Sequence, residues 1–144
     1  MMNLTIWIVQ MISEQKGIYA MIGKICKISA PYYDSVKKRM SFKTRPALVI
    51  AQADCGDYVI LPVSTITHKG NIDPDFDIPI DPSVYPKLNL NKISYVRTHK
   101  QTIAHRASII SVISDLRTEY EELYLEILIK REDFSYDTTT QGLI

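Results

Sequence analysis

Residues 42–50 read FKTRPALVI, and this stretch is the most informative in the chain. Lys43, Thr44 and Arg45 come first, followed by Pro46 and then by four apolar residues without a polar break. A short continuous apolar run predicts a strand buried on both faces, and proline is tolerated at a strand's first position. Arg45 therefore stands at the entrance of a rigid buried strand, which would hold its guanidinium in a fixed place.

The next segment predicts a hairpin. DCGD at residues 54–57 favours a turn, and YVILPV at residues 58–63 favours a second strand. In an antiparallel hairpin, the beginning of the first strand lies beside the end of the second. We therefore expect Arg45 and Ser64 at the same rim of the sheet. A guanidinium and a hydroxyl at one rim suit a phosphate group; an arginine paired with a structural carboxylate is the alternative.

The rest of the chain predicts a mainly β fold with a C-terminal α-helix. Residues 30–44 are polar and are expected to form a long loop. Residues 114–130 have apolar side chains at helical spacing, with Ser114 as the expected N-cap. Several short strands and one packed helix indicate a small, strongly bent sheet or partial barrel. The further strands are expected at residues 23–29, 76–81 and 93–98, with a turn and a short strand over 102–110.

The charge of the chain is nearly balanced but unevenly distributed. The 144 residues carry a formal net charge of +1, which gives no overall attraction to nucleic acid or membrane. Residues 24–45 nevertheless contain seven lysines and arginines against Asp34 alone, and residues 92–106 contain cations and no acid. Such segregation favours a basic face for an anion, and a scattered solvated surface remains the alternative. The two cysteines, Cys26 and Cys55, have no metal-ligand spacing and fit a reducing compartment, although their pairing stays open.

One domain is expected, over residues 21–131, with a C-terminal tail over 132–144. Residues 1–20 form either an added N-terminal segment or a start assigned too early. Their apolar part is short and lacks the basic region of a signal peptide, and it is too short to span a membrane. These features favour a cytoplasmic protein without membrane contact.

Taken together, several segments resemble the MazF/PemK (Kid) family of toxin–antitoxin toxins over about residues 23–130. They are GKICKIS, KTRPALVI, YVILPVSTIT, FDIPID and NKISYVRTHKQTI, followed by the amphipathic helix. The resemblance implies the small SH3-like barrel with a C-terminal helix found in CcdB, Kid and MazF, usually as a homodimer. It also implies a sequence-selective endoribonuclease that cleaves single-stranded messenger RNA without a metal or other cofactor. A cognate antitoxin protein would silence it.

The resemblance also implies roles for particular residues. Arg45 maps to the catalytic arginine, and Ser64 maps to a strand-end hydroxyl that is more often threonine. The acidic residue expected in the later strand is absent, and His99 at about that place is the candidate proton carrier. The basic stretch before Arg45 either holds the RNA backbone or is a solvated loop. The expected RNA-binding residues are Lys37, Lys38, Arg39, Lys43, Thr65 and Arg97.

Two rival functions remain open on the sequence. Proteins of the same fold, such as CcdB, inhibit DNA gyrase by binding and without catalysis. A family member that has lost catalysis and only binds RNA or a protein partner is the second rival. The arginine before proline and the hydroxyl at the strand end favour the ribonuclease.

Overall fold

The structure is a computed structural model that describes residues 4–5, 8 and 20–142. The segment expected over residues 1–20 therefore lies largely outside the described residues. The elements are β1 (Lys24–Asp34), β2 (Arg39–Gln52), β3 (Asp57–Ser64), β4 (Asp77–Ile80), β5 (Ser94–Arg97), β6 (Thr102–His105), β7 (Ile109–Asp115), α2 (Leu116–Glu119) and α3 (Glu121–Gly142).

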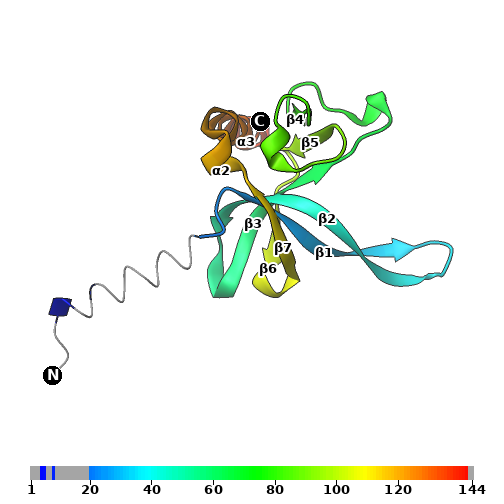
Figure 1. Ribbon diagram of the computed structural model, residues 1–144. Helices are drawn as coiled ribbons and strands as arrows, with labels where there is room; N and C mark the ends of the chain where they lie inside the picture. Colours follow the sequence, from blue (N-terminus) through cyan, green and yellow to red (C-terminus); the bar gives the residue numbers. More distant parts are fainter. Residues whose placement is uncertain (1–3, 6–7, 9–19, 143–144) are drawn as a thin grey trace.

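The seven strands of the described residues form one strongly bent antiparallel sheet. Its order is β4-β5-β3-β2-β1-β7, and β6 pairs with the first half of β3. The sheet curls into a half-barrel, and α2 and α3 pack at one end of it (Figure 1). The predicted fold class, mainly β with a C-terminal helix, is confirmed.

Strand β2 is buried on both faces where the sequence is continuously apolar. Leu48 and Ile50 belong to the core cluster that also contains residues of α2 and α3. Ala47 and Val49 belong to a second cluster, formed with residues of β1 and β3. Because successive side chains of a strand point to opposite faces, a run without polar breaks is what a doubly covered strand requires.

Residues 30–44 are not the loop that their polarity suggested. Strands β1 and β2 continue through them as a long hairpin, with Asp34 paired to Arg39. The Asp34 carboxylate accepts hydrogen bonds from the backbone N–H groups of Val36 and Lys37, at 3.0 and 3.1 Å, and so fixes the turn. The hairpin projects from the body of the protein (Figure 1). Most of its distal side chains are exposed on both faces, so no apolar alternation marks it as strand.

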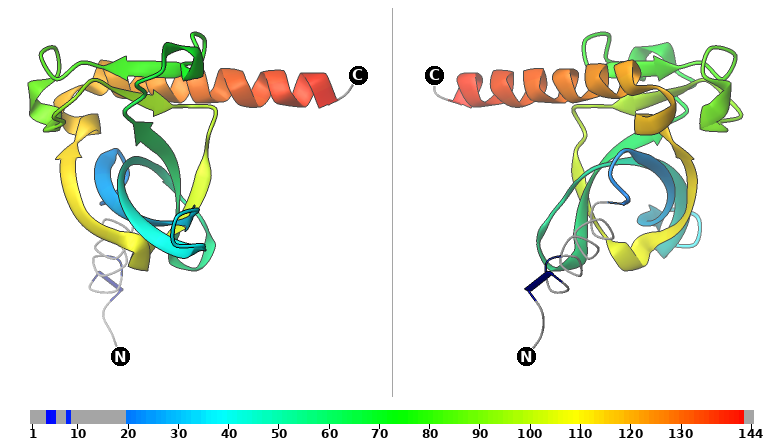
Figure 2. Two further views of the ribbon diagram at one scale, coloured as in Figure 1. Left: turned by 90° about the vertical axis from the view of Figure 1, so that its right-hand side faces the viewer. Right: turned by 60° about the vertical axis from the view of Figure 1, so that its left-hand side comes forward.

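The C-terminal helix differs from its prediction at both ends. Ser114 lies in β7, and the N-cap is Asp115, whose carboxylate accepts a hydrogen bond from the Thr118 N–H at 3.2 Å. Tyr120, with an extended φ of −141°, separates α2 from α3. Helix α3 continues past Arg131 to Gly142, and its distal half extends beyond the strands (Figure 2).

The two cysteines do not form a disulfide. Cys26 is buried on β1 and Cys55 is exposed in the turn between β2 and β3, and both are free thiols. Within the described part of the chain, no helix is both long enough and apolar enough to cross a membrane.

Candidate functional site

The predicted hairpin of β2 and β3 is confirmed, and its register places the candidate site. Ala47 pairs with Pro62 and Leu48 with Leu61. The same register, continued two residues, brings Arg45 opposite Ser64. At this point β2 continues with β1 into the projecting hairpin, while Ser64 of β3 pairs with Tyr95 of β5. The divergence of β2 and β3 leaves an open rim.

A shallow depression of about 290 Å³ lies at that rim. Val63, which is only 2% exposed, anchors the neighbouring Ser64 to the core. Of the predicted site residues, Lys43, Arg45, Ser64 and Thr65 come together here. The complete lining is Lys43, Arg45, Pro46, Val63, Ser64 and Thr65.

The polar groups of this depression are unpaired. Within the described part of the chain, no carboxylate lines the depression, and the Arg45 guanidinium has no hydrogen bond or ion pair. The Arg45 side chain is exposed, as are Lys43 and Thr65. Two cations and two hydroxyls with no partner among the described residues are able to hold a phosphate by charge-assisted hydrogen bonds.

Arg97 is placed differently from Arg45. Its Nε donates to the Asp77 carboxylate at 3.2 Å, and its Nη2 donates to the backbone carbonyl of Asn71 at 3.3 Å. The Asp77 side chain is fully buried, and the Arg97 side chain is 25% exposed. Arg97 does not line the depression; it compensates a buried charge.

His99, the predicted proton carrier, is not brought together with Arg45 and Ser64. Its ring lies between Phe76 and Phe134, with centroids 6.1 Å from each. Its Nδ1 is 3.7 Å from the Asp77 carboxylate and has no hydrogen-bond partner in the described chain. Only 11% of the side chain is exposed. The ring is thus packed between Phe76, which precedes β4, and α3, and it does not line the Arg45 depression.

A turn before β4 holds Asp77 in place. The Asp73 N–H donates to Asp77 Oδ2 at 2.8 Å, and Asp73 Oδ1 accepts from the N–H groups of Asp75 and Phe76. The hydrogen bond from Asp75, more than that from Phe76, lowers the pKa of Asp73 below its usual value, and the nearby Arg97 guanidinium lowers it further. Asp77 was not among the predicted site residues.

Lys37, Lys38 and Arg39 lie at the exposed tip of the β1–β2 hairpin. Arg39 and Arg45 are six residues apart on β2, which is roughly 20 Å along an extended strand. The predicted basic residues therefore divide into two groups, Lys43 at the depression and the other three at the hairpin tip.

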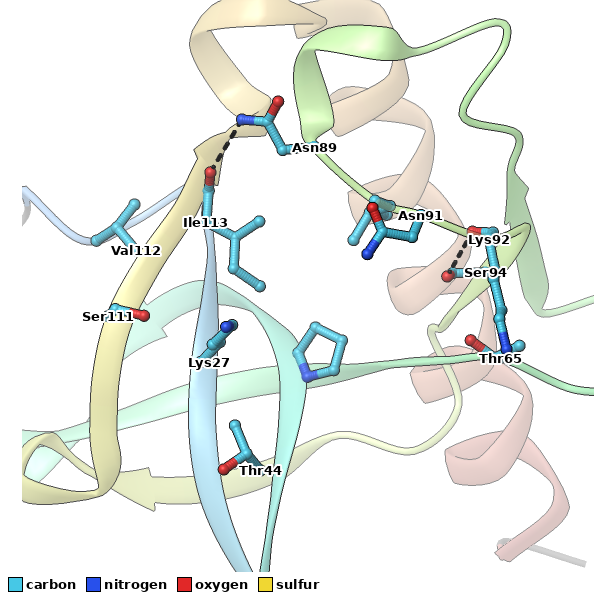
Figure 3. A pocket seen from close by; sticks show the side chains of 12 residues that line it. Lys27, Thr44, Thr65, Asn89, Asn91, Lys92, Ser94, Ser111, Val112 and Ile113 are labelled. Atoms are coloured by element: carbon cyan, nitrogen blue, oxygen red, sulfur yellow. Dashed lines mark hydrogen bonds between the residues drawn. The ribbon is translucent and has the colours of Figure 1, made fainter.

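A groove of about 560 Å³ was not predicted. It lies beside the depression, because Pro46 and Thr65 line both. Its far wall is the loop after Asn89, which carries Asn91 and Lys92 (Figure 3). The only signal in the sequence was NLNK at residues 89–92, two amides and a lysine in an irregular stretch. Among the described residues, no three His, Cys, Asp or Glu side chains gather where they would hold a metal ion.

Comparison with known proteins bears on the fold. No protein-family model and no curated protein matches the sequence. Among solved structures, the chain is similar to the Mycobacterium tuberculosis toxin MazF-mt6, with a TM-score of 0.52 and 16% sequence identity. The match covers 76% of this chain and 96% of that one. The bent antiparallel sheet, its C-terminal helix and this match together give the chain the fold of the MazF-type toxins.

Proposed function

We propose that this chain is a sequence-selective endoribonuclease toxin of a type II toxin–antitoxin system. It cleaves single-stranded messenger RNA in the cytoplasm, acts as a homodimer and is silenced by a cognate antitoxin. The observation that carries the proposal is the Arg45 guanidinium, which has no partner among the described residues and lies just before the buried part of β2, in one depression with Ser64. The MazF-type fold supports the same activity.

The chemistry is attack of a ribose 2′-OH on the adjacent phosphate. The bond from phosphorus to the 5′-oxygen of the next nucleotide breaks, and the 2′-OH proton passes through solvent to that oxygen. The products are a 2′,3′-cyclic phosphate and a 5′-hydroxyl. Negative charge develops on the non-bridging oxygens, and the Arg45 guanidinium and the Ser64 hydroxyl donate hydrogen bonds to it. A guanidinium stays protonated, so Arg45 acts as an electrostatic stabiliser and not as a base. The nucleophile belongs to the substrate, so the reaction requires no metal or enzyme-bound intermediate, and DNA is not cleaved.

The surroundings of Arg45 support this role. A buried strand fixes its backbone, because Ala47 and Leu48 are 3% and 0% exposed. The guanidinium is therefore positioned before substrate arrives, and no protein carboxylate competes for it among the described residues. Preorganised donors of this kind are more effective than donors that must first be ordered.

The decisive experiment compares wild type with Arg45→Ala on synthetic single-stranded RNA, with the product ends mapped. Wild type is expected to give 2′,3′-cyclic phosphate ends in the presence of EDTA. The cleavage rate of Arg45→Ala is expected to be lower by a factor of about 100 or more, as after removal of one transition-state donor. Arg106→Ala is the matched control, because Arg106 follows β6 near the opposite end of β3 and should leave the rate unchanged.

Equal cleavage by wild type and Arg45→Ala would refute the assignment of Arg45. RNA binding without cleavage by wild type would indicate a protein that only binds RNA. Intact RNA together with gyrase-trapped DNA breaks on induction in cells would indicate a gyrase inhibitor.

A further inference from the structure

The groove beside the Arg45 depression has the form of a built ligand site. One side is formed by β1, β2 and β7, and the other by residues 89–94. Its volume of about 560 Å³ is within the usual range for small-molecule sites, roughly 300–1,000 Å³. Through Pro46 and Thr65 it is continuous with the depression that contains Arg45.

The loop that forms the far wall is held at both ends. Asn89 has a left-handed φ of 56°, and its side-chain amide donates to the Ile113 carbonyl of β7 at 3.3 Å. The preceding Leu88 is fully buried. At the other end, the buried Ser94 hydroxyl donates to the Lys92 carbonyl at 3.0 Å. The groove is therefore formed before any ligand enters.

The residues between these anchors present unpaired polar groups. Asn91 is exposed, and its amide forms no hydrogen bond to the described chain. Figure 3 shows its side chain directed into the groove, and it shows the Lys92 side chain extending from the loop toward Thr65. Lys27 supplies a second cation, and no carboxylate is among the described residues that line the groove. The groove thus offers the Asn91 amide inside it and the Lys92 ammonium at the boundary with the depression.

We propose that this groove holds one unpaired nucleobase of single-stranded RNA, next to the cleaved phosphate. The Asn91 amide supplies a donor and an acceptor side by side, which is the pattern that reads a base edge. Lys92, between groove and depression, contacts the phosphate that joins this nucleotide to its neighbour. The inference rests on the proposed function for its substrate class, and it makes Asn91 a determinant of base preference and Lys92 a determinant of affinity.

Binding is measured with four fluorescent pentamers, each of a single base and 2′-O-methylated, so that no nucleophile is present and nothing is cleaved. Wild type is expected to bind the four with different Kd values. Asn91→Ala should reduce the ratio between the strongest and weakest pentamer about tenfold. Lys92→Ala should weaken all four alike and lower the slope of log Kd against log salt concentration by about one.

Two variants control for the loss of an amide and of a charge elsewhere. Asn71→Ala removes an exposed amide near β4, and Lys87→Ala removes a lysine paired with Glu119, outside the groove. Both should bind the pentamers as wild type does. Circular dichroism of each variant confirms that the fold is retained.

The base-binding inference is overturned if wild type binds no pentamer, or if Asn91→Ala keeps the base preference of wild type. It is also overturned if Lys92→Ala keeps the wild-type affinity and salt slope. The ribonuclease proposal is tested separately by cleavage of unmodified RNA. If the protein discriminates among the pentamers but does not cut RNA, the base-binding inference stands and the ribonuclease proposal is refuted. If it cuts RNA but does not discriminate among the pentamers, the ribonuclease proposal stands and the base-binding inference is refuted.

Discussion

At the scale of single residues, two arginines, Arg45 on β2 and Arg97 on β5, have opposite surroundings. Arg97 is bound to a fully buried carboxylate, whereas Arg45 faces an open depression without a partner among the described residues. The sequence placed Arg45 at the entrance of one expected strand and Arg97 within another, and it predicted RNA contact for Arg97. It gave no sign of the carboxylate that binds Arg97, because this partner lies 20 residues earlier, on β4. An arginine bound to a buried acid compensates that charge, and an unpaired arginine remains available for a ligand.

Asp77→Asn tests the structural side of this distinction. The substitution removes the buried negative charge that Arg97 compensates, and it leaves the guanidinium without its ion-pair partner. Breaking a buried pair from one side costs about 3 kcal/mol or more of the free energy of unfolding. Urea denaturation of wild type and variant measures the difference.

Asp81→Asn is the control for that experiment. Asp81 is a turn residue whose Oδ1 accepts hydrogen bonds from the Ser83 N–H and hydroxyl, and an amide oxygen can replace it. The Asp81→Asn substitution should change the midpoint of urea unfolding very little. If the two variants unfold at the same urea concentration, Asp77 does not stabilise the fold in the way described.

At the scale of elements, the β1–β2 hairpin has two functionally different halves. Near the body of the protein, β2 is buried on both faces and fixes Arg45. Beyond Arg45, Phe42 and Met40 are exposed, and the tip carries Lys37 and Lys38. Side chains that contact phosphates without reading bases give affinity that falls with salt. We therefore expect the tip to contribute RNA affinity and the base of the hairpin to contribute chemistry.

The double variant Lys37→Ala and Lys38→Asn separates these contributions. Asparagine is used at position 38 because Lys38 has a φ of 53°, which asparagine tolerates better than alanine. RNA affinity should fall equally for all sequences, with a salt slope smaller by about one to two. The rate of cleavage at saturating RNA should be unchanged. Fluorescence anisotropy at several salt concentrations measures the first effect, and single-turnover cleavage measures the second.

Lys69 and Lys100 provide the matched control, because both are exposed lysines outside the hairpin. Replacing both by alanine removes the same charge and should change the salt slope less. A slope that changes equally in the two double variants would show that net charge, and not the hairpin tip, determines affinity.

At the scale of the whole molecule, the sequence predicted what depends on apolar periodicity. The β2–β3 hairpin and the opposition of Arg45 and Ser64 followed from two short apolar strands and a turn. The distal hairpin was missed because its residues are exposed on both faces and carry no alternation. The groove and the contacts of Asp77 with Arg97 and His99 were missed, because each is assembled from segments far apart in the chain. Contacts of that kind leave no local pattern for a single sequence to reveal.

The core of the sheet contains a buried thiol whose titration is coupled to unfolding. Cys26 is fully buried on β1, among Ile28, Val49 and Ile60. Burial raises the pKa of its thiol from 9.0 to about 11, and Lys24 opposes this only in part. The unfolded chain therefore ionises Cys26 at a lower pH than the folded protein does. The stabilising contribution is complete below pH 9.0 and is lost as the pH rises toward about 11.

Two measurements follow for Cys26. A maleimide at neutral pH should label only Cys55 in the folded protein and both thiols in denaturant, because Cys26 is inaccessible. The free energy of unfolding of wild type should fall more steeply between pH 9 and pH 11 than that of Cys26→Ala, since only wild type has the shifted thiol. Cys55→Ala, which removes the exposed thiol, should keep the wild-type slope. If the free energy of unfolding has the same pH slope in wild type and Cys26→Ala, or if both thiols of the folded protein are labelled rapidly, Cys26 is not buried as described.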